Sequence, residues 1–243
     1  MSRGIIACQF LGRLGNCMFS YAFARSYAER NDLELQVDPW IGSRVFGLND
    51  PPIANPESLT RVCENTIEEG MANVLYRSYS QQAKCLTYTR SDCRRWFKFS
   101  DEIENAMRGY NFPEIVGHRR VGDYPGYGIY PVVSEASYYR AMRHYYPATS
   151  FNIHLLTEEN PTIAPLPEEL KDIADFYLMT KALVLFRGNS SFSWWAAVLN
   201  EVAQIYSPII SGLPGGEHDC VFVPGNWPRF ANLEFTTDLH LPE

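Results

Sequence analysis

The chain has 243 residues, enough for one large domain or two small domains with hydrophobic cores of their own. Its composition, 46% hydrophobic and 20% charged, is that of a compact globular protein and excludes a disordered or fibrous chain. The net charge of −7, without a long basic run, argues against a nucleic-acid partner bound through its phosphates.

The sequence also bounds the compartment and the cofactors. The apolar stretch at residues 4–8 is too short for a secretory signal, and no run approaches the length of a membrane span. We therefore expect a cytoplasmic protein without a transmembrane segment. The six cysteines include no Cys-x-x-Cys pair and are interpreted as free thiols, and no cluster of histidine and cysteine predicts a metal site.

The first predicted elements form a βαβ unit. Residues 4–10 are an apolar run typical of a strand, and residues 17–30 carry apolar side chains at helical spacing, with Asn16 as the expected N-cap. Residues 33–38 alternate as a second strand, which is the pattern of a parallel sheet.

Gly12 and Gly15 lie in the turn between the first strand and this helix. Glycines there allow the backbone to approach a ligand at the start of the helix. A tight structural connection explains the same two residues at least as well. Further along, residues 39–60 are rich in proline and glycine and predict a surface excursion, and residues 101–108 predict a short helix.

The second half alternates predicted strands and helices. Strands are expected at residues 115–116, 151–156, 182–186 and 203–210, and helices at residues 134–145, at 166–175 and after residue 190. Polar residues follow the first three strands, at 118–123, 157–159 and 187–193. Because the carboxyl ends of parallel strands meet along one edge of a sheet, we expect these three polar segments to converge.

The first polar segment contains His118, Arg119, Arg120 and Asp123. Arginine presents a planar fork of donors that binds phosphate oxygens in pairs, so a guanidinium here predicts a diphosphate ligand. The alternative is a surface loop in which the two arginines and Asp123 simply pair with one another.

The third polar segment places Ser190, Ser191 and Ser193 at the start of an apolar helix. Unpaired backbone N–H groups, the helix dipole and the serine hydroxyls together favour an anion at this position. An ordinary serine N-cap is the alternative, and it explains one serine better than three.

Several motifs recur in a fixed order along the chain. They are Gly12-Arg13-Leu14-Gly15-Asn16 with Met18-Phe19 and Tyr21-Ala22, His118-x-Arg120-x-Gly122-Asp123-Tyr124, Thr157-Glu158-Glu159, Asp175-x-x-Leu178-Met179, and Asn189-Ser190-Ser191-Phe192-Ser193-Trp194-Trp195. Together they resemble the motifs of the α-1,2-fucosyltransferase family of inverting glycosyltransferases. Thr157-Glu158-Glu159 stands where that family usually has Ser-Asp-Asp.

The resemblance implies an α/β fold of the GT-B type, in which two Rossmann-like domains with parallel sheets face each other across a cleft. It implies an acceptor-side domain over residues 1–113 and a nucleotide-sugar-binding domain over residues 114–243. No metal and no cofactor besides the GDP-fucose donor are expected.

The resemblance also implies roles for individual residues. Arg120 would hold the diphosphate, His118 would contact the nucleotide, and Asp123 is the candidate base, although it could only orient the arginines. Residues near the guanine or ribose would be Glu158 and Glu159. Those at the phosphate or elsewhere in the donor site would be Asn189, Ser190, Ser191, Phe192 and Ser193, and those shaping the floor near the transferred sugar would be Gly12, Gly15 and Asn16.

The predicted function is transfer of L-fucose from GDP-fucose to a hydroxyl of a galactose-containing glycan, with an α-1,2 linkage and inversion. The partners are thus a nucleotide sugar and a glycan acceptor. Three alternatives remain: an enzyme of the same fold with another nucleotide sugar, a non-catalytic relative that binds nucleotide or glycan, and an unrelated α/β enzyme that holds phosphate at the same sheet edge.

Overall fold

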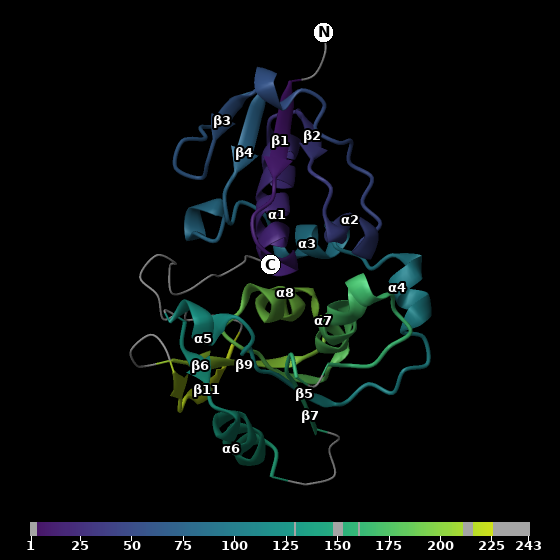
Figure 1. The fold of residues 1–243 in the computed structure, drawn as a ribbon, viewed down its shortest axis with the longest axis vertical. Coiled ribbons are helices and arrows are strands. Elements are labelled where there is room, and N and C mark those ends of the chain that lie inside the picture. Colours follow the sequence, from purple (N-terminus) through teal and green to yellow (C-terminus); the bar gives the residue numbers. More distant parts are fainter. Residues whose placement is uncertain (1–3, 129, 148–152, 160, 211–215, 226–243) are drawn as a thin grey trace. The chain divides into compact units, whose positions relative to one another are not determined.

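The computed structural model describes residues 4–128, 130–147, 153–159, 161–210 and 216–225 (Figure 1). The described residues divide into two compact units, one ending at Glu102 and the other beginning at Ile103. Each unit contains parallel strands connected through helices, so the predicted α/β class is confirmed. No helix in these ranges is long and apolar enough to cross a membrane.

The first unit is built on a parallel sheet in the order β2-β1-β4-β3. Its strands are β1 (Ile5–Gln9), β2 (Glu34–Val37), β3 (Thr60–Val62) and β4 (Val74–Arg77). Helix α1 (Leu14–Arg30) connects β1 to the parallel strand β2, which confirms the predicted βαβ unit. Met18, Phe19 and Ala22 of α1 are fully buried, and burial of such apolar side chains fixes the helix on the unit.

The start of α1 corrects one prediction. The N-cap is Arg13, which makes no side-chain capping bond, and Asn16 lies inside the first turn instead of preceding it. Gly12 has a φ of +78°, a conformation that glycine adopts without strain, so the chain turns directly after β1 and the helix begins earlier than predicted.

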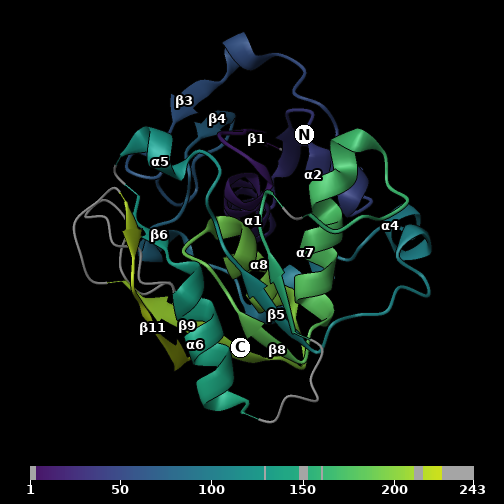
Figure 2. The ribbon, with the colours of Figure 1, turned by 60° about the horizontal axis from the view of Figure 1, so that its bottom comes forward.

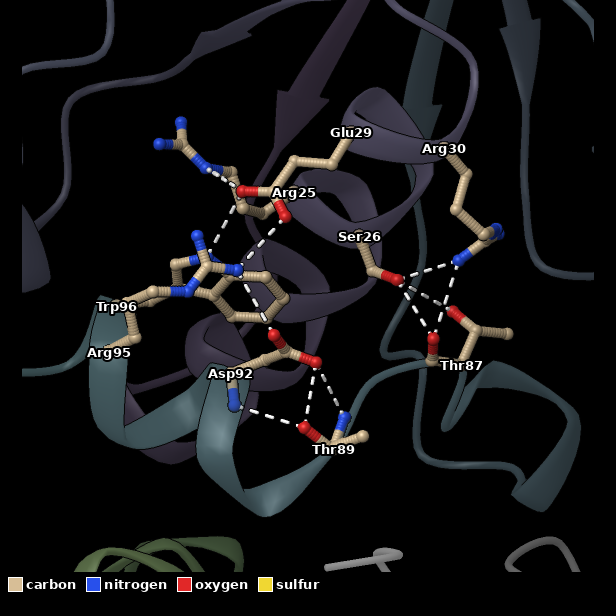
Figure 3. A network of polar contacts seen from close by, with 9 residues as sticks. All are labelled: Arg25, Ser26, Glu29, Arg30, Thr87, Thr89, Asp92, Arg95 and Trp96. Atoms are coloured by element: carbon tan, nitrogen blue, oxygen red, sulfur yellow. Dashed lines mark hydrogen bonds and ion pairs between the residues drawn. The ribbon is translucent and has the colours of Figure 1, made fainter.

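Short helices complete the first unit. They are α2 (Ile41–Val45) and α3 (Arg90–Trp96), with 3₁₀ turns η1 (Pro56–Ser58) and η2 (Ala83–Cys85). Helix α4 (Asp101–Ala106) begins in the first unit and continues into the second. Thr89 and Asp92 form a capping box at the start of α3, in which each side chain accepts the other's backbone N–H. Figure 3 shows the polar network that joins α3 to α1, where Arg95 and the Trp96 indole both donate to Glu29.

The second unit is built on a sheet in the order β11-β9-β8-β5-β7. Its strands are β5 (Ile115–His118), β7 (Ile153–Leu156), β8 (Val184–Phe186), β9 (Gln204–Ile209) and β11 (Val221–Pro224). All pair in parallel except β11, which runs antiparallel to β9. The first two residues of the strand predicted at 151–156 lie outside the described residues.

The sequence did not predict β11, nor the short pair β6 (Val132–Val133) and β10 (Glu217–His218). These segments are too brief to show a clear hydrophobic period, so their pairing depends on contacts that are distant in sequence.

Helices cover both faces of the second sheet. Figures 1 and 2 show α6 (Glu135–Tyr145) on one face, and α7 (Lys171–Lys181) and α8 (Ser191–Leu199) on the other. Tyr138 and Met142 of α6 are buried in a core that includes Phe186 of β8. The short helix α5 (Tyr124–Tyr127) and the 3₁₀ turn η3 (Glu168–Leu170) lie in the connections.

The bounds predicted for α7, residues 166–175, were wrong. Pro167 has an extended backbone, with ψ of 152°, and delays the start of the helix. Phe176, Leu178 and Met179 continue the buried face beyond the predicted end, so packing in the core extends the helix to Lys181.

Candidate functional site

The three predicted polar segments follow three neighbouring strands. Strand β5 lies between β8 and β7, and all three run in parallel. Their carboxyl ends therefore lie at one edge of the sheet, which places residues 118–123, 157–159 and 187–193 together. The predicted convergence is confirmed by contacts that join all three segments.

Arg120 is at the centre of these contacts. Its two terminal nitrogens donate to the carboxylates of Glu158 and Asp123, which come from different segments. Glu158 also accepts the backbone N–H of Val121 at 3.1 Å, so it binds the loop after β7 to the loop after β5. The guanidinium carbon of Arg120 lies 5.3 Å from the centre of the Tyr124 ring, within the range of a cation–π contact.

Arg119 points elsewhere. It donates to the carbonyl of Val133 at 3.0 Å and to the carboxylate of Glu217 at 2.7 Å. The alternative in which both arginines pair with Asp123 is therefore wrong for Arg119. Arg120 does pair with Asp123, as that alternative predicted, but it also reaches across to Glu158.

His118 ends β5 as a neutral, buried imidazole. It is 7% exposed, and among the described residues its Nδ1 atom has no hydrogen-bond partner. Burial is the main cause that lowers the pKa of His118 from 6.5 to about 4; Arg120 and Arg187 act in the same direction, and Glu158 opposes them. The imidazole therefore carries no charge at neutral pH.

The serines of the third segment have different roles. Ser190 is the N-cap of α8 and accepts the backbone N–H of Ser193 at 3.3 Å, as the ordinary N-cap alternative predicted. The Ser193 hydroxyl donates to the carbonyl of Gly188 at 3.2 Å and is fully buried. Ser191 and Phe192 are half-buried, and the Phe192 ring lies 5.6 Å from that of His118.

Two hydrogen bonds join the third segment to residues that follow the first segment. The amide of Asn189 donates to the carbonyl of Pro131 at 2.8 Å, and the Tyr124 hydroxyl donates to the carbonyl of Asn189 at 2.8 Å. Asn189 is buried, so its observed contacts position the loops against each other.

The loop after β7 carries Glu158 and Glu159, and both side chains are exposed. This loop is anchored to α7, because the buried carboxylate of Asp175 accepts the backbone N–H of Thr162 at 2.8 Å. Burial raises the pKa of Asp175 above its ordinary value. Asp175 was noticed in the sequence only as part of a motif, and its anchoring role was not predicted.

Sequence reasoning also missed Gly188 as a packing position. A Cβ atom at this residue would lie 2.6 Å from the carbonyl oxygen of His118, which is a backbone atom and cannot move aside alone. Only glycine allows the ends of β5 and β8 to approach this closely. The available signal was a glycine two residues after an apolar strand, because glycine often marks a close approach of another backbone.

We expect Gly188→Ala to lower the free energy of unfolding by about 2 kcal/mol, because the added methyl group forces the two strand ends apart. Gly126→Ala is the matched control, since a Cβ atom there meets no atom within 4 Å. Urea unfolding of both variants measures the difference. Equal stability of the two variants would show that the contact at His118 relaxes without cost.

Gly12, Gly15 and Asn16 belong to the first unit. A Cβ atom at Gly12 would lie 2.4 Å from the side-chain nitrogen of Asn16, so these two residues are in close contact. Asn16 Oδ1 accepts a hydrogen bond from the buried Gln81 at 2.8 Å. Gly15 is buried within the first turn of α1. Gln81 follows β4 and was not predicted, because no sequence period relates it to Asn16.

Two other features of the described residues bear on ligands. A hollow of about 480 Å³ lies in the first unit against Arg25, Glu29 and Asp50, and it contains none of the predicted site residues. No group of three or more His, Cys, Asp or Glu side chains in the described ranges is arranged to hold a metal ion.

No family model and no curated protein matches the sequence. Solved structures do match it. The NodZ α-1,6-fucosyltransferase soaked with GDP-fucose is 17% identical, with a TM-score of 0.54 over 92% of this chain and 99% of that chain. NodZ co-crystallised with GDP is 16% identical, with a TM-score of 0.55 over 93% and 100% of the two chains.

NodZ from Bradyrhizobium is 15% identical, with a TM-score of 0.53 over 85% of this chain and 96% of that chain. At these identities the likeness concerns the fold. The chain therefore has an α/β fold similar to that of the fucosyltransferase NodZ.

Proposed function

We propose that the chain is a glycosyltransferase that transfers L-fucose from GDP-fucose to a hydroxyl of a galactose-containing glycan. The observation that most supports this proposal is the convergence of three polar segments at the sheet edge where α/β folds bind ligands, with Arg120 joining the first segment to the second. The fold similarity to NodZ adds support, because NodZ structures were obtained with GDP and with GDP-fucose.

Arg120 is proposed to bind the donor diphosphate. During transfer, the acceptor hydroxyl oxygen attacks C1 of fucose and releases its proton to solvent water. The bond from C1 to the diphosphate breaks at the same time, so negative charge develops on the leaving GDP. A guanidinium already oriented toward that position offsets the charge, and it does so without a metal. Inversion follows from this single displacement.

Asp123 and Glu158 set the state of Arg120 before the donor binds. Both carboxylates accept hydrogen bonds from its guanidinium, so the diphosphate oxygens have to replace at least one of them. Glu158 is the residue proposed to turn toward the ribose or guanine, together with Glu159. The contact between Asp123 and Arg120 favours an orienting role for Asp123 over that of catalytic base.

The remaining proposed donor contacts follow the same geometry. His118 would contact the nucleotide as a neutral imidazole, since its pKa lies well below neutral pH. Phosphate would be held at the start of α8 by Ser191, Phe192 and the backbone there, while Asn189, Ser190 and Ser193 would keep the loop in shape.

We further propose that the two units are the two domains of a GT-B glycosyltransferase. The first unit would be the acceptor side, with Gly12, Gly15 and Asn16 near the transferred sugar, and the second would hold the nucleotide sugar. The close contact of Gly12 with Asn16 supports a shared role for these two residues.

Two linkages have support. The sequence motifs resemble α-1,2-fucosyltransferases, and we propose this linkage first. The solved structures of similar fold include an α-1,6 enzyme, which favours α-1,6 transfer as the second candidate. Linkage analysis of the product by NMR distinguishes them, with galactosides and other glycans offered as acceptors.

Nucleotide binding is the first test. At a hundred times its Kd, a ligand of the native state stabilises the protein by about 2.7 kcal/mol. For a chain of this length that is a rise of roughly 5–10 °C in Tm. We expect GDP and GDP-fucose to give this rise and UDP, ADP and CDP to give none.

Other outcomes of the panel select among the alternatives. A larger rise with UDP would indicate a different nucleotide sugar, and no rise with any nucleotide would favour an unrelated phosphate-binding enzyme. A protein that binds GDP-fucose but neither transfers nor hydrolyses it would be the non-catalytic relative.

A further inference from the structure

Arg187, the residue after β8, is a buried cation that the proposed function has not used. It is 0% exposed, and among the described residues it pairs with no carboxylate. Its Nε atom donates to the Ser207 hydroxyl at 2.9 Å and its Nη1 atom to the carbonyl of Gly188 at 2.9 Å. Its Nη2 atom has no partner within the described part of the chain.

A buried charge without a counter-charge is costly. Removing a guanidinium from water costs several kcal/mol, and an ion pair normally offsets that cost. Burial lowers the pKa of Arg187 from 12.5 to about 9, and at neutral pH the group still carries its positive charge. An uncompensated charge of this kind in a protein core indicates a functional demand for it.

The position of Arg187 indicates what the demand is. The carbonyl of Gly188 accepts hydrogen bonds from both Arg187 and the Ser193 hydroxyl, so the guanidinium and the first turn of α8 share one acceptor. The charge of Arg187 also lowers the pKa of His118. The unpartnered Nδ1 atom of His118 lies 3.4 Å from the position that a Cβ atom would have at Gly188. Two buried polar atoms without partners thus lie beside the start of α8.

We propose that Arg187 is a buried counter-charge for a diphosphate bound at the start of α8. The guanidinium does not touch the ligand. It acts through the protein interior, where the low dielectric strengthens its attraction for an anion. The inference rests on the proposed function, which places the donor diphosphate at this edge. It adds a second positive charge to that of Arg120, whose own charge is offset by Asp123 and Glu158.

The surroundings of Arg187 make the proposal testable with little damage to the fold. If Arg187 is replaced, the carbonyl of Gly188 keeps the hydrogen bond from Ser193. The Ser207 hydroxyl keeps its own bond to the carbonyl of Gly225, at 2.6 Å. Arg187→Met leaves neither group without a partner, and it removes the cost of burying an unpaired charge.

The test is calorimetric titration of wild type and Arg187→Met with GDP, GMP, guanosine and inorganic pyrophosphate. We expect Arg187→Met to weaken GDP binding about 10- to 100-fold, the effect of one charge several ångströms away in a medium of intermediate dielectric. The loss should shrink from GDP to GMP and vanish for guanosine, while Tm without ligand stays unchanged or rises. Arg187→Lys should restore most of the GDP affinity.

Arg140→Met is the matched control, because it removes the same charge from an exposed position on α6. A GDP affinity of Arg187→Met equal to that of Arg140→Met would overturn the proposal. Equal losses for GDP and guanosine would also overturn it, because they would reveal a structural role only.

Inorganic pyrophosphate separates this inference from the proposed function. Suppose that the protein does not bind GDP but binds pyrophosphate, and that Arg187→Met weakens this binding. The counter-charge role of Arg187 would then be retained, and the GDP-dependent function would be refuted. If instead wild type and Arg187→Met bind GDP with equal affinity, the GDP-dependent function would be retained and the counter-charge role of Arg187 would be refuted. If Arg187→Met does not fold, Arg187→Gln with the same titrations replaces it.

Discussion

Arg120→Ala is expected to reduce fucosyl transfer by about a hundred- to a thousandfold, the usual cost of removing a group that stabilises charge in the transition state. Arg120 presents its guanidinium where three polar segments meet, and its side chain is 15% exposed. Its loss leaves two carboxylates facing the proposed diphosphate position, so repulsion adds to the lost attraction. GDP affinity should fall as well.

Kinetics with GDP-fucose and an accepted glycan measure this effect, and circular dichroism and urea unfolding establish that the fold is intact. Arg119→Ala is the control, because Arg119 follows the same strand but binds Val133 and Glu217 instead. Its kcat/KM should stay within about threefold of the wild-type value. Such a change is smaller than a tenfold change, which corresponds to about 1.4 kcal/mol. Wild-type activity in Arg120→Ala would remove Arg120 from the mechanism.

The sequence predicted the parts of the site that depend on local patterns. Apolar runs at β5, β7 and β8 predicted strands, and the polar residues after each strand predicted a shared edge. Parallel pairing makes that inference robust, because it needs only the strand order and not the side-chain contacts. Arg120 was singled out in this way, and it does contact residues from two of the segments.

Contacts between distant residues were not predictable in the same way. Glu158 reaches Arg120 and the backbone of Val121 because its loop bends back, and no period in the sequence encodes that bend. Gly188 was read as part of a polar turn, whereas its structural demand comes from the carbonyl of His118 on another strand. The sequence likewise places Arg187 only in a polar segment after a strand, and nothing in its pattern indicates that the side chain is fully buried.

One local prediction failed for a physical reason, and the contacts of another divide its residues into separate roles. Asn16 has the chemistry of an N-cap, but the positive φ of Gly12 lets α1 begin earlier and places Asn16 inside the helix, where it bonds to Gln81. The serines at the start of α8 resembled a uniform anion site. One caps the helix and another bonds the preceding loop, so only part of the cluster is left for a ligand.

The second large effect concerns pH and stability. His118 has a pKa of about 4 in the folded protein and an ordinary value of 6.5, so folding favours its neutral form. Above pH 6.5 the His118 imidazole is neutral in both the folded and the unfolded chain, so it does not affect how the free energy of unfolding depends on pH. As pH falls from 6.5 toward 4, the unfolded chain takes up a proton that the folded protein does not, and unfolding becomes easier by about 3 kcal/mol in total.

Urea unfolding of wild type and His118→Gln at pH 7.5 and pH 5 measures this contribution. Wild type should lose about 2 kcal/mol more than the variant over that interval. Other groups, including Asp175 with its raised pKa, are common to both proteins and cancel in the comparison. An equal loss in the two proteins would mean that His118 protonates in place.

The same experiment bears on the site, because Arg120 and Arg187 both lower the pKa of His118. Protonation would place a third positive charge among groups that are proposed to bind a diphosphate. Saturating GDP supplies negative charge and should therefore raise the pKa of His118 in the complex. With GDP bound, the extra stability that wild type loses between pH 7.5 and pH 5, compared with His118→Gln, should therefore become smaller. If this difference is unchanged by GDP, the diphosphate lies away from His118.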